Sequence, residues 1–329
     1  MIFGTAARVR RFLHGTGVLS AERLARPVLC VGNISAGGTG KTPHVMYLAK
    51  WLSGIGRRVA ILSRGYRRGS RGVVWVSRGE GKTGGFLECG DEPVLMARSL
   101  PGVPVLVGES RAAAGAEALK HVSVDVFLLD DGFQHLSLAR DFDLLLVDCG
   151  QGLGNRMTLP FGRLREPPSH ARFADGLVVT KCPDIAAGER VARSVPFPAD
   201  SPRAFSRTVP KGMVGLDGKP YDLAPAGSEV FVFSGLAGNA QFRETLSLAG
   251  YKIGGFAGFP DHHPYDMRDL ARIARESKGR PIVTTEKDLV RIPADTPFPV
   301  GAFRVEVEFL DGWERLSQSI LKSLDGASR

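Results

Sequence analysis

The sequence has little cysteine and no long apolar run. Its four cysteines, Cys30, Cys89, Cys149 and Cys182, stand far apart and form no Cys-X-X-Cys pair. This spacing excludes the common zinc and disulfide frameworks and favours reduced, buried thiols. No apolar stretch approaches the length of about 20 residues that a membrane-spanning helix needs. The basic residues near the N-terminus are not followed by an apolar segment, so we expect no signal peptide.

Acidic residues are almost missing from the first quarter of the chain. Residues 1–79 contain fourteen Lys or Arg and one acid, Glu22, whereas the whole 329-residue chain has a net charge of +9. A positive segment predicts an anionic partner: a nucleotide, a phosphorylated substrate, a phospholipid surface or a nucleic acid. The composition, 43% hydrophobic and 23% charged, is that of a globular protein and excludes a disordered chain.

Short apolar runs alternate with helical patterns along the first part of the chain. The runs cover residues 28–33, 59–63, 103–107, 124–130, 144–148 and 177–180. Helical patterns cover residues 44–52, 92–99 and 110–119. Continuous apolar runs are typical of strands that are buried on both faces of a parallel sheet. The alternation therefore predicts an α/β fold with a doubly wound, mostly parallel sheet.

The stretch from residue 183 to about 225 is rich in proline and glycine and has no long periodic pattern, which predicts a boundary or linker. A second α/β group follows it. Its strands are expected at residues 229–234, 251–256, 281–285 and 303–309, and its helices at 240–248, 267–277 and 312–324. We expect a first lobe at residues 1–205 and a smaller second lobe at 206–329, with the functional site in the cleft between them.

A glycine-rich loop joins the first expected strand to the first expected helix. It consists of Ser35, Ala36, Gly37, Gly38, Thr39, Gly40, Lys41 and Thr42. Glycines let backbone N–H groups approach phosphate oxygens, and the helix start adds partial positive charge. Lys41 would reach the β- and γ-phosphates of ATP, and the Thr42 hydroxyl would ligate Mg²⁺. The loop predicts a P-loop NTPase-type sheet, although Ser35 replaces the first glycine of the common pattern.

Carboxylates stand at three places where chemistry is expected. Asp130 and Asp131 end an apolar strand, as does the acid that holds Mg²⁺ in many nucleotide enzymes. Asp91 and Glu92 precede a helix. Acidic residues are favoured at helix N-termini, which alone would account for them, and the alternative is that Asp91 acts as a general base. Glu166 lies in an irregular loop between prolines and is a further candidate for a metal or substrate contact.

A histidine pair, His262 and His263, lies in the expected second lobe. No cysteine is near and the spacing fits no common zinc motif, so a catalytic or substrate-binding imidazole is the better interpretation. Residues 284–288 faintly resemble a guanine-binding motif, but the spacing is wrong and does not favour a GTPase.

Arginines cluster at Arg64, Arg67 and Arg68, and this cluster indicates either a solvated loop or a contact with an anion. We find no nucleic-acid reader motif and expect no nucleic-acid partner. Residues 2–19 mix apolar side chains with arginines. If helical, they would form a short basic amphipathic segment at an anionic membrane surface, where each Arg contributes roughly 1 kcal/mol.

Seven motifs together resemble the tetraacyldisaccharide 4′-kinase family of lipid A biosynthesis. They are VGNISAGGTGKTP, SRGY, GDEP, LLDDGFQH, GNRMTLPFGRLREP, FPDHHPY and TTEKD, and they occur in the family's order across residues 31–288. The resemblance implies a kinase that uses ATP and Mg²⁺ to phosphorylate the 4′-hydroxyl of a tetraacyldisaccharide 1-phosphate. It also implies peripheral association with the cytoplasmic face of the bacterial inner membrane. One departure is Arg163, which stands where a proline is usual.

The resemblance also assigns roles to individual residues. The implied catalytic residues are Lys41, Asp91 and His262. The implied metal ligands are Thr42, Glu92, Asp130, Asp131 and Glu166. The implied substrate contacts are Arg64, Arg67, Arg68, Gln134 and His135.

Two other functions fit the same loop. One is a membrane-associated P-loop ATPase switch, and the other is a kinase of a different small anionic substrate. In related dimeric ATPases, a lysine at the second loop position reaches the partner's nucleotide. Ala36 occupies that position here, which counts against such a dimer, and we expect a monomer.

Overall fold

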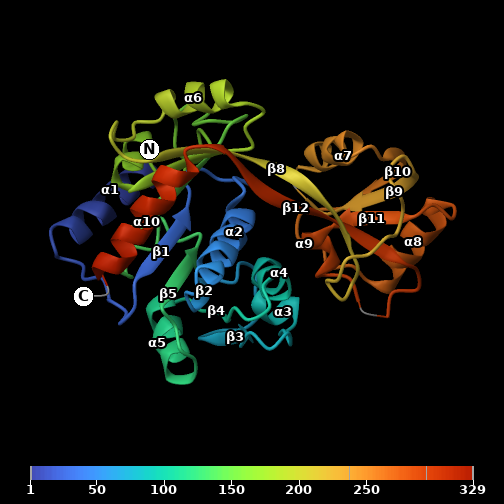
Figure 1. The fold of residues 1–329 in the computed structure, drawn as a ribbon, viewed down its shortest axis with the longest axis horizontal. Coiled ribbons are helices and arrows are strands. Elements are labelled where there is room, and N and C mark those ends of the chain that lie inside the picture. Colours follow the sequence, from blue (N-terminus) through green and yellow to red (C-terminus); the bar gives the residue numbers. More distant parts are fainter. Residues whose placement is uncertain (1, 237, 294, 328–329) are drawn as a thin grey trace.

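The computed structural model describes residues 2–236, 238–293 and 295–327. One twelve-stranded sheet runs through it in the order β10-β9-β11-β12-β8-β7-β6-β1-β5-β2-β4-β3. Figure 1 shows two lobes, joined by the long strands β8 (Arg203–Val214) and β12 (Val300–Asp311). This arrangement confirms the predicted α/β class with a second, smaller lobe.

The first lobe contains the parallel part of the sheet that the apolar runs predict. Its strands are β1 (Val28–Gly32), β2 (Val59–Ser63), β3 (Val74–Ser77), β4 (Val105–Val107), β5 (Val126–Asp130), β6 (Phe142–Asp148) and β7 (Gly176–Thr180). Its helices are α1 (Ile2–Gly15), α2 (Lys41–Gly54), α3 (Phe86–Cys89), α4 (Asp91–Ser99), α5 (Arg111–His121) and α6 (Ile185–Ser194), with a 3₁₀ helix at Pro168–Phe173. Among these strands, only β3, an antiparallel edge strand, was not predicted. The short helix α3, the helix α6 and the 3₁₀ helix were not predicted either.

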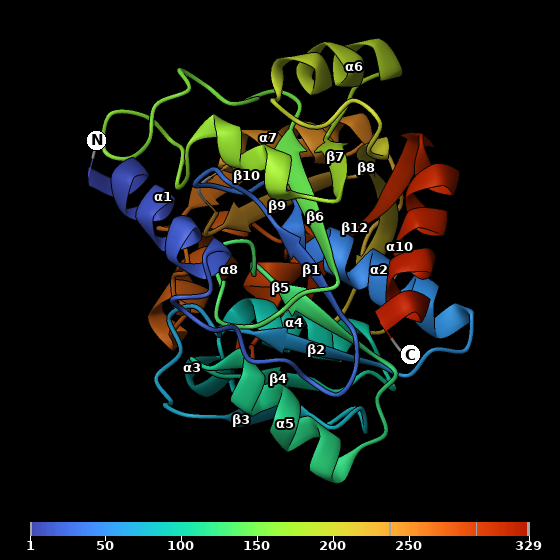
Figure 2. The ribbon, with the colours of Figure 1, turned by 90° about the vertical axis from the view of Figure 1, so that its left-hand side faces the viewer.

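Burial on both faces explains why the apolar runs of these strands are continuous. Leu29 and Val31 of β1 pack into one core cluster, and Val28 and Cys30 pack into another on the opposite face. Helices cover both faces, as Figure 2 shows for α2 and α10 on one side. Since parallel strands end at one edge, the loops after β1 and β5 meet there.

The second lobe repeats the pattern on a smaller scale. Its strands are β9 (Glu229–Ser234), β10 (Lys252–Gly258) and β11 (Ile282–Thr285), and its helices are α7 (Asn239–Leu248), α8 (Met267–Ser277) and α9 (Glu286–Leu289). Its strands also bury both faces, with Phe231 and Phe233 in one cluster and Val230 and Val232 in another.

The predicted linker was wrong. Residues 183–225 contain α6, capped by the Asp184 side chain, and the twelve-residue strand β8. Proline and glycine masked this strand in the sequence because Pro210 lies beside a register shift and Gly212 has a φ of 89°. The strand forms through its antiparallel pairing with β12, so its stability depends on a partner far away in the chain.

The lobes do not separate at a single point in the sequence. The boundary predicted after residue 205 falls inside β8. The last helix, α10 (Trp313–Ala327), returns to the first lobe, where Leu316, Ile320 and Leu324 join the core beneath α2. The chain therefore crosses between the lobes on both β8 and β12, which holds the two halves of the cleft opposite each other. Among the described residues, no helix has the length and apolar character to cross a membrane.

Candidate active site

The phosphate loop lies between β1 and α2, where the sequence predicted it. Gly37 has a φ of 111° and Gly40, which precedes the first residue of α2, has a φ of 80°. Both angles are in the left-handed region that favours glycine, so these glycines are needed for the shape of the loop. Lys41 and Thr42 begin the helix, where backbone N–H groups are free for an anion.

Polar side chains from neighbouring strands hold this loop in shape. The Asn33 amide donates to the Thr39 hydroxyl over 2.9 Å, and the Thr180 hydroxyl donates to the Thr39 carbonyl over 3.0 Å. Lys181 donates to the Gly38 carbonyl over 2.7 Å and pairs with Asp148. Asn33, Thr180 and Lys181 were not among the predicted site residues, although Asn33 lies within the motif VGNISAGGTGKTP.

Asp130 and Asp131 lie beside the loop but in different surroundings. The Lys41 Nζ is 3.6 Å from the Asp131 Oδ1, and Arg165 also pairs with Asp131 at 2.9 Å. Asp130 is buried, accepts one hydrogen bond from Ser63, and has a second oxygen, Oδ1, that has no hydrogen-bond partner among the described residues. Burial, together with the charges of Glu92 and Asp131, raises the pKa of Asp130 to about 7. A buried carboxylate with a free oxygen beside two more acids is suited to a cation.

Asp91 and His262 come together from different lobes, 171 residues apart. The His262 Nδ1 is 2.8 Å from the Asp91 Oδ2. An ionised carboxylate can only accept hydrogen bonds, so we assign the proton to Nδ1. Burial alone would raise the pKa of Asp91, but the His262 hydrogen bond and the charges of Lys287 and Arg291 outweigh it, and the net pKa is below the usual value. Asp91 is thus a buried carboxylate that stays ionised at neutral pH.

Lys287 and Arg291 complete this cluster, and sequence reasoning did not select either. The Lys287 Nζ is 3.2 Å from Glu92 and 3.4 Å from the His262 Nε2, while the buried Arg291 Nε is 3.7 Å from Asp91. Lys287 belongs to the TTEKD segment at the start of α9, which was the available signal. The second lobe therefore supplies three cationic or imidazole groups to the carboxylates of the first.

The backbone of His262 has a φ of 64°, an uncommon conformation for a residue with a side chain. Across the cleft, Arg67 donates to the Asp261 carbonyl over 3.1 Å, and the Tyr66 ring is 5.5 Å from the His262 ring. The arginine segment of the first lobe thus contacts the histidine turn of the second. Strained residues held by such contacts cluster at functional sites.

Glu166 is an anchor for α1, in contrast to its predicted role as a metal ligand. Its oxygens accept from the Arg11 Nε at 2.7 Å, from Gln134 at 2.9 Å and from His170 at 2.6 Å. These contacts occupy the carboxylate and leave little room for a cation. They also engage the Gln134 amide, which donates to the Asn33 carbonyl as well.

The predicted substrate contacts fall into two groups. The Arg68 side chain is buried in its own loop and bound to Glu109 at 2.6 Å, and its role as a substrate contact stays a prediction. Arg64 is exposed and lies near His135. Burial, followed by the charges of Arg111, Arg10, Arg140 and Arg64, lowers the pKa of His135 to about 4. This side of the site is therefore strongly positive around a neutral histidine.

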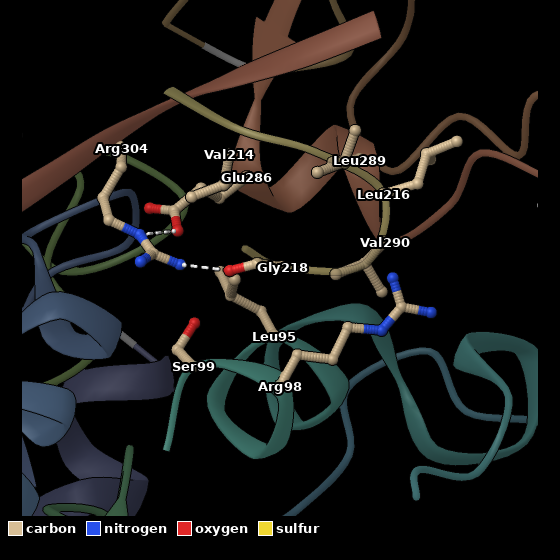
Figure 3. A pocket seen from close by; sticks show the side chains of 10 residues that line it. All are labelled: Leu95, Arg98, Ser99, Val214, Leu216, Gly218, Glu286, Leu289, Val290 and Arg304. Atoms are coloured by element: carbon tan, nitrogen blue, oxygen red, sulfur yellow. Dashed lines mark hydrogen bonds and ion pairs between the residues drawn. The ribbon is translucent and has the colours of Figure 1, made fainter. Parts of the chain in front are cut away.

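A pocket lies between α4 and the second lobe (Figure 3). Leu95 and Arg98 line one wall, and Glu286, which pairs with Arg304, lines the other. The pocket is separate from the phosphate loop. It borders the same α4 and α9 that carry Asp91 and Lys287, so it marks the interface between the lobes.

The loop, the buried carboxylate of Asp130 and the Asp91–His262 pair between the lobes define a P-loop enzyme of the kinase class. The family model described as "Tetraacyldisaccharide-1-P 4′-kinase" (LpxK) matches residues 1–325. The chain belongs to this family.

Named relatives and a solved structure agree with this family assignment. The tetraacyldisaccharide 4′-kinase of Syntrophus aciditrophicus is 43% identical over 86% of this chain and 80% of its own. That of Anaeromyxobacter sp. strain Fw109-5 is 40% identical over 97% and 88%. The crystal structure of LpxK from Aquifex aeolicus in complex with ATP is 36% identical, covers 98% of this chain and 96% of its own, and has a TM-score of 0.82.

Proposed function

We propose that this protein transfers the γ-phosphate of ATP to the 4′-hydroxyl of tetraacyldisaccharide 1-phosphate, a step in lipid A biosynthesis. The observation that carries the proposal is the contact of Asp91 with His262 across the cleft, beside a phosphate loop. A hydroxyl is a weak nucleophile at neutral pH and needs a positioned base, whereas simple nucleotide binding would not require this pair.

In the proposed reaction Asp91 accepts the proton of the attacking hydroxyl. His262 holds the carboxylate through Nδ1, and Lys287 and Arg291 keep it ionised before the substrate arrives. Lys41 and the loop amides stabilise the negative charge that develops on the transferred phosphoryl group.

The residues present fit Mg²⁺. The Oδ1 of Asp130 has no hydrogen-bond partner among the described residues, and the pKa of Asp130 is raised. A cation bound here would relieve the repulsion between Asp130 and the carboxylates of Glu92 and Asp131. Thr42 and Asp130 would hold the ion, with Asp131 and Glu92 close by, and the chemistry it supplies is charge neutralisation on the β- and γ-phosphates. Glu166 is not part of this set, because Arg11, Gln134 and His170 occupy its oxygens.

The positive cluster around His135 is suited to the 1-phosphate of the acceptor. Arg111 is buried, and its Nε has no hydrogen-bond partner among the described residues. Arg111 donates to the Glu109 carbonyl but has no ion pair with an acid among the described residues, so this guanidinium beside exposed Arg64 favours a dianionic group. Arg67, which reaches the second lobe, is a further candidate contact.

A peripheral membrane contact would bring the acyl chains to this cleft. On α1, Val9 and Phe12 are exposed beside Arg8 and Arg10, and Phe161 on a nearby loop is 65% exposed. Apolar side chains interleaved with arginines suit the surface of an anionic bilayer. We propose that this face lies on the inner membrane from the cytoplasmic side.

The transfer assay uses labelled ATP, Mg²⁺ and purified disaccharide 1-phosphate. Label is expected in the glycolipid, and Lys41→Ala is expected to abolish the transfer because the charge on the phosphates is lost. Release of inorganic phosphate alone would instead favour an ATPase switch. Transfer to other anionic acceptors, without transfer to the glycolipid, would favour a different kinase.

The membrane face can be tested separately. Val9→Ser combined with Phe12→Ser is expected to reduce binding to vesicles that contain anionic lipid by roughly tenfold, because two apolar contacts are lost. Leu248→Ser is the matched control, since Leu248 is 83% exposed on α7 of the other lobe. Sedimentation with vesicles measures the effect, and equal losses in both variants would contradict the assignment of this face.

A further inference from the structure

Arg163 lies against the rim of the phosphate loop. Its carbonyl accepts from the Ala36 N–H over 2.7 Å, and its Nη2 donates to the Ala36 carbonyl over 3.0 Å. A side chain built at Gly37 would come within 2.9 Å of the same Nη2. Ser35 and Leu164 form a bridge next to these contacts. Arg163 is thus fixed to the loop through both its backbone and its guanidinium.

The charge of Arg163 is not neutralised. No ion pair joins it to an acid among the described residues, whereas neighbouring Arg165 pairs with Asp131 and Lys181 pairs with Asp148. Its Nε is shielded from solvent and has no hydrogen-bond partner in this part of the chain. A guanidinium has five N–H donors, and leaving one shielded and unpaired is costly. The Arg163 guanidinium can therefore bind an anion.

The neighbours of residues 163–165 indicate which anion Arg163 would bind. Two residues after Arg163, Arg165 binds Asp131, which is 3.6 Å from the Lys41 Nζ. A P-loop lysine serves the β- and γ-phosphates. A nucleotide whose terminal phosphates meet Lys41 would therefore have Arg165 near that end, and Arg163, two residues earlier, at the loop residue Ala36.

We propose that Arg163 contacts the terminal phosphate of ATP from within the same chain. This inference rests on the proposed function, since it assumes that the loop binds ATP. The guanidinium supplies a positive charge at the second position of the loop, where Ala36 itself has none. It would bind the γ-phosphate and stabilise its developing charge during transfer.

Nucleotide selectivity tests this role without the acceptor. Arg163→Gln keeps a donor for the Ala36 carbonyl but removes the charge, and Arg163→Lys keeps a charge. By calorimetry, Arg163→Gln is expected to weaken Mg·ATP binding by about tenfold or more, as expected for the loss of a charged hydrogen bond, and to change Mg·ADP binding by less than about twofold. Arg163→Lys should recover part of the ATP affinity. Arg156→Ala is the control, because the exposed Arg156 side chain in the same segment donates only to the Ser194 carbonyl among the described residues.

Other results would overturn the proposal. If Arg163→Gln weakens ATP and ADP binding equally, Arg163 only shapes the loop. If neither affinity changes, Arg163 does not contact the nucleotide. These readouts are independent of glycolipid phosphorylation: a protein that keeps the ATP-specific effect but fails to phosphorylate the disaccharide would refute the proposed function and leave the role of Arg163 standing.

Discussion

Asp91→Asn is expected to lower the rate of phosphoryl transfer by about 10²–10⁴-fold, the range that general-base catalysis contributes. Asparagine has nearly the same shape but cannot accept the proton of the attacking hydroxyl. Its amide can still bond His262 if it presents its oxygen, so the cleft should keep its form. We expect ATP binding to change little, because no hydrogen bond or ion pair joins the Asp91 side chain to the phosphate loop among the described residues. Single-turnover transfer and nucleotide binding, measured on the same preparation, would separate the two effects.

The pH dependence sharpens this test. The pKa of Asp91 is below its ordinary value, so the wild-type base is ionised throughout the neutral range. Its stabilising contribution is present above the ordinary Asp pKa of about 4 and is lost as the pH falls through the lower folded value. The wild-type rate should therefore not fall through protonation of Asp91 between pH 8 and about pH 5. The residual rate of Asp91→Asn should lack any dependence on this carboxyl.

A second Asp–His pair provides the control. Asp269 and His263 also lie in the second lobe, with the His263 Nε2 at 2.7 Å from the Asp269 Oδ2. Asp269→Asn should leave the transfer rate unchanged, because Asp269 caps α8 and no hydrogen bond or ion pair joins the Asp269 and His263 side chains to the first lobe among the described residues. If Asp91→Asn turns over at a near wild-type rate while folded, Asp91 is not the base.

The sequence predicted those parts of the molecule whose signals are local. The phosphate loop is eight consecutive residues, and the apolar strands are buried on both faces, so spacing and burial indicate them directly. Asp130 was predicted from its place at a strand end. The partnership of Asp91 with His262 came only from the resemblance, because no local pattern relates residues 171 apart.

The parts that were missed depend on contacts between distant segments. Glu166 has the residue type and the loop position of a metal ligand, but its carboxylate accepts a hydrogen bond from Arg11, which is 155 residues away in the chain. Lys287 enters the site only because β12 and β8 hold the second lobe against the first. The strand character of β8 was hidden for the same reason, since its partner β12 begins 86 residues later than its own last residue, Val214.

Asp130→Asn is expected to separate stability from activity. Transfer should fall by about 10²-fold or more, because the residue best placed for Mg²⁺ loses its charge. The protein without Mg²⁺ should nevertheless become more stable. Asparagine removes a buried charge that Glu92 and Asp131 repel, and functional residues are often kept at such a cost to stability.

The raised pKa of Asp130 determines how the stability difference between Asp130→Asn and the wild type changes with pH. The folded pKa of Asp130 is about 7, above the unfolded value, so its stabilising contribution is complete below about pH 4 and is lost as the pH rises through 7. Without Mg²⁺, the melting temperature of Asp130→Asn should therefore exceed that of the wild type most clearly near pH 8, and the difference should shrink towards pH 4. Adding Mg²⁺ with a nucleotide should stabilise the wild type more than the variant.

A second buried carboxylate makes the comparison specific. The buried Oδ1 of Asp143 also has no hydrogen-bond partner among the described residues, but its Oδ2 pairs with Arg140 at 3.0 Å. Burial raises the pKa of Asp143 too, and the charge of Arg140 acts against this shift. Asp143→Asn should destabilise the protein, because it leaves a mostly buried guanidinium without its acid. Opposite changes in melting temperature for the two variants would show that Asp130 is kept ionisable for a cation. A loss of stability in Asp130→Asn at pH 8 without Mg²⁺ would mean that the carboxylate serves the fold, and the metal site would have to be sought elsewhere.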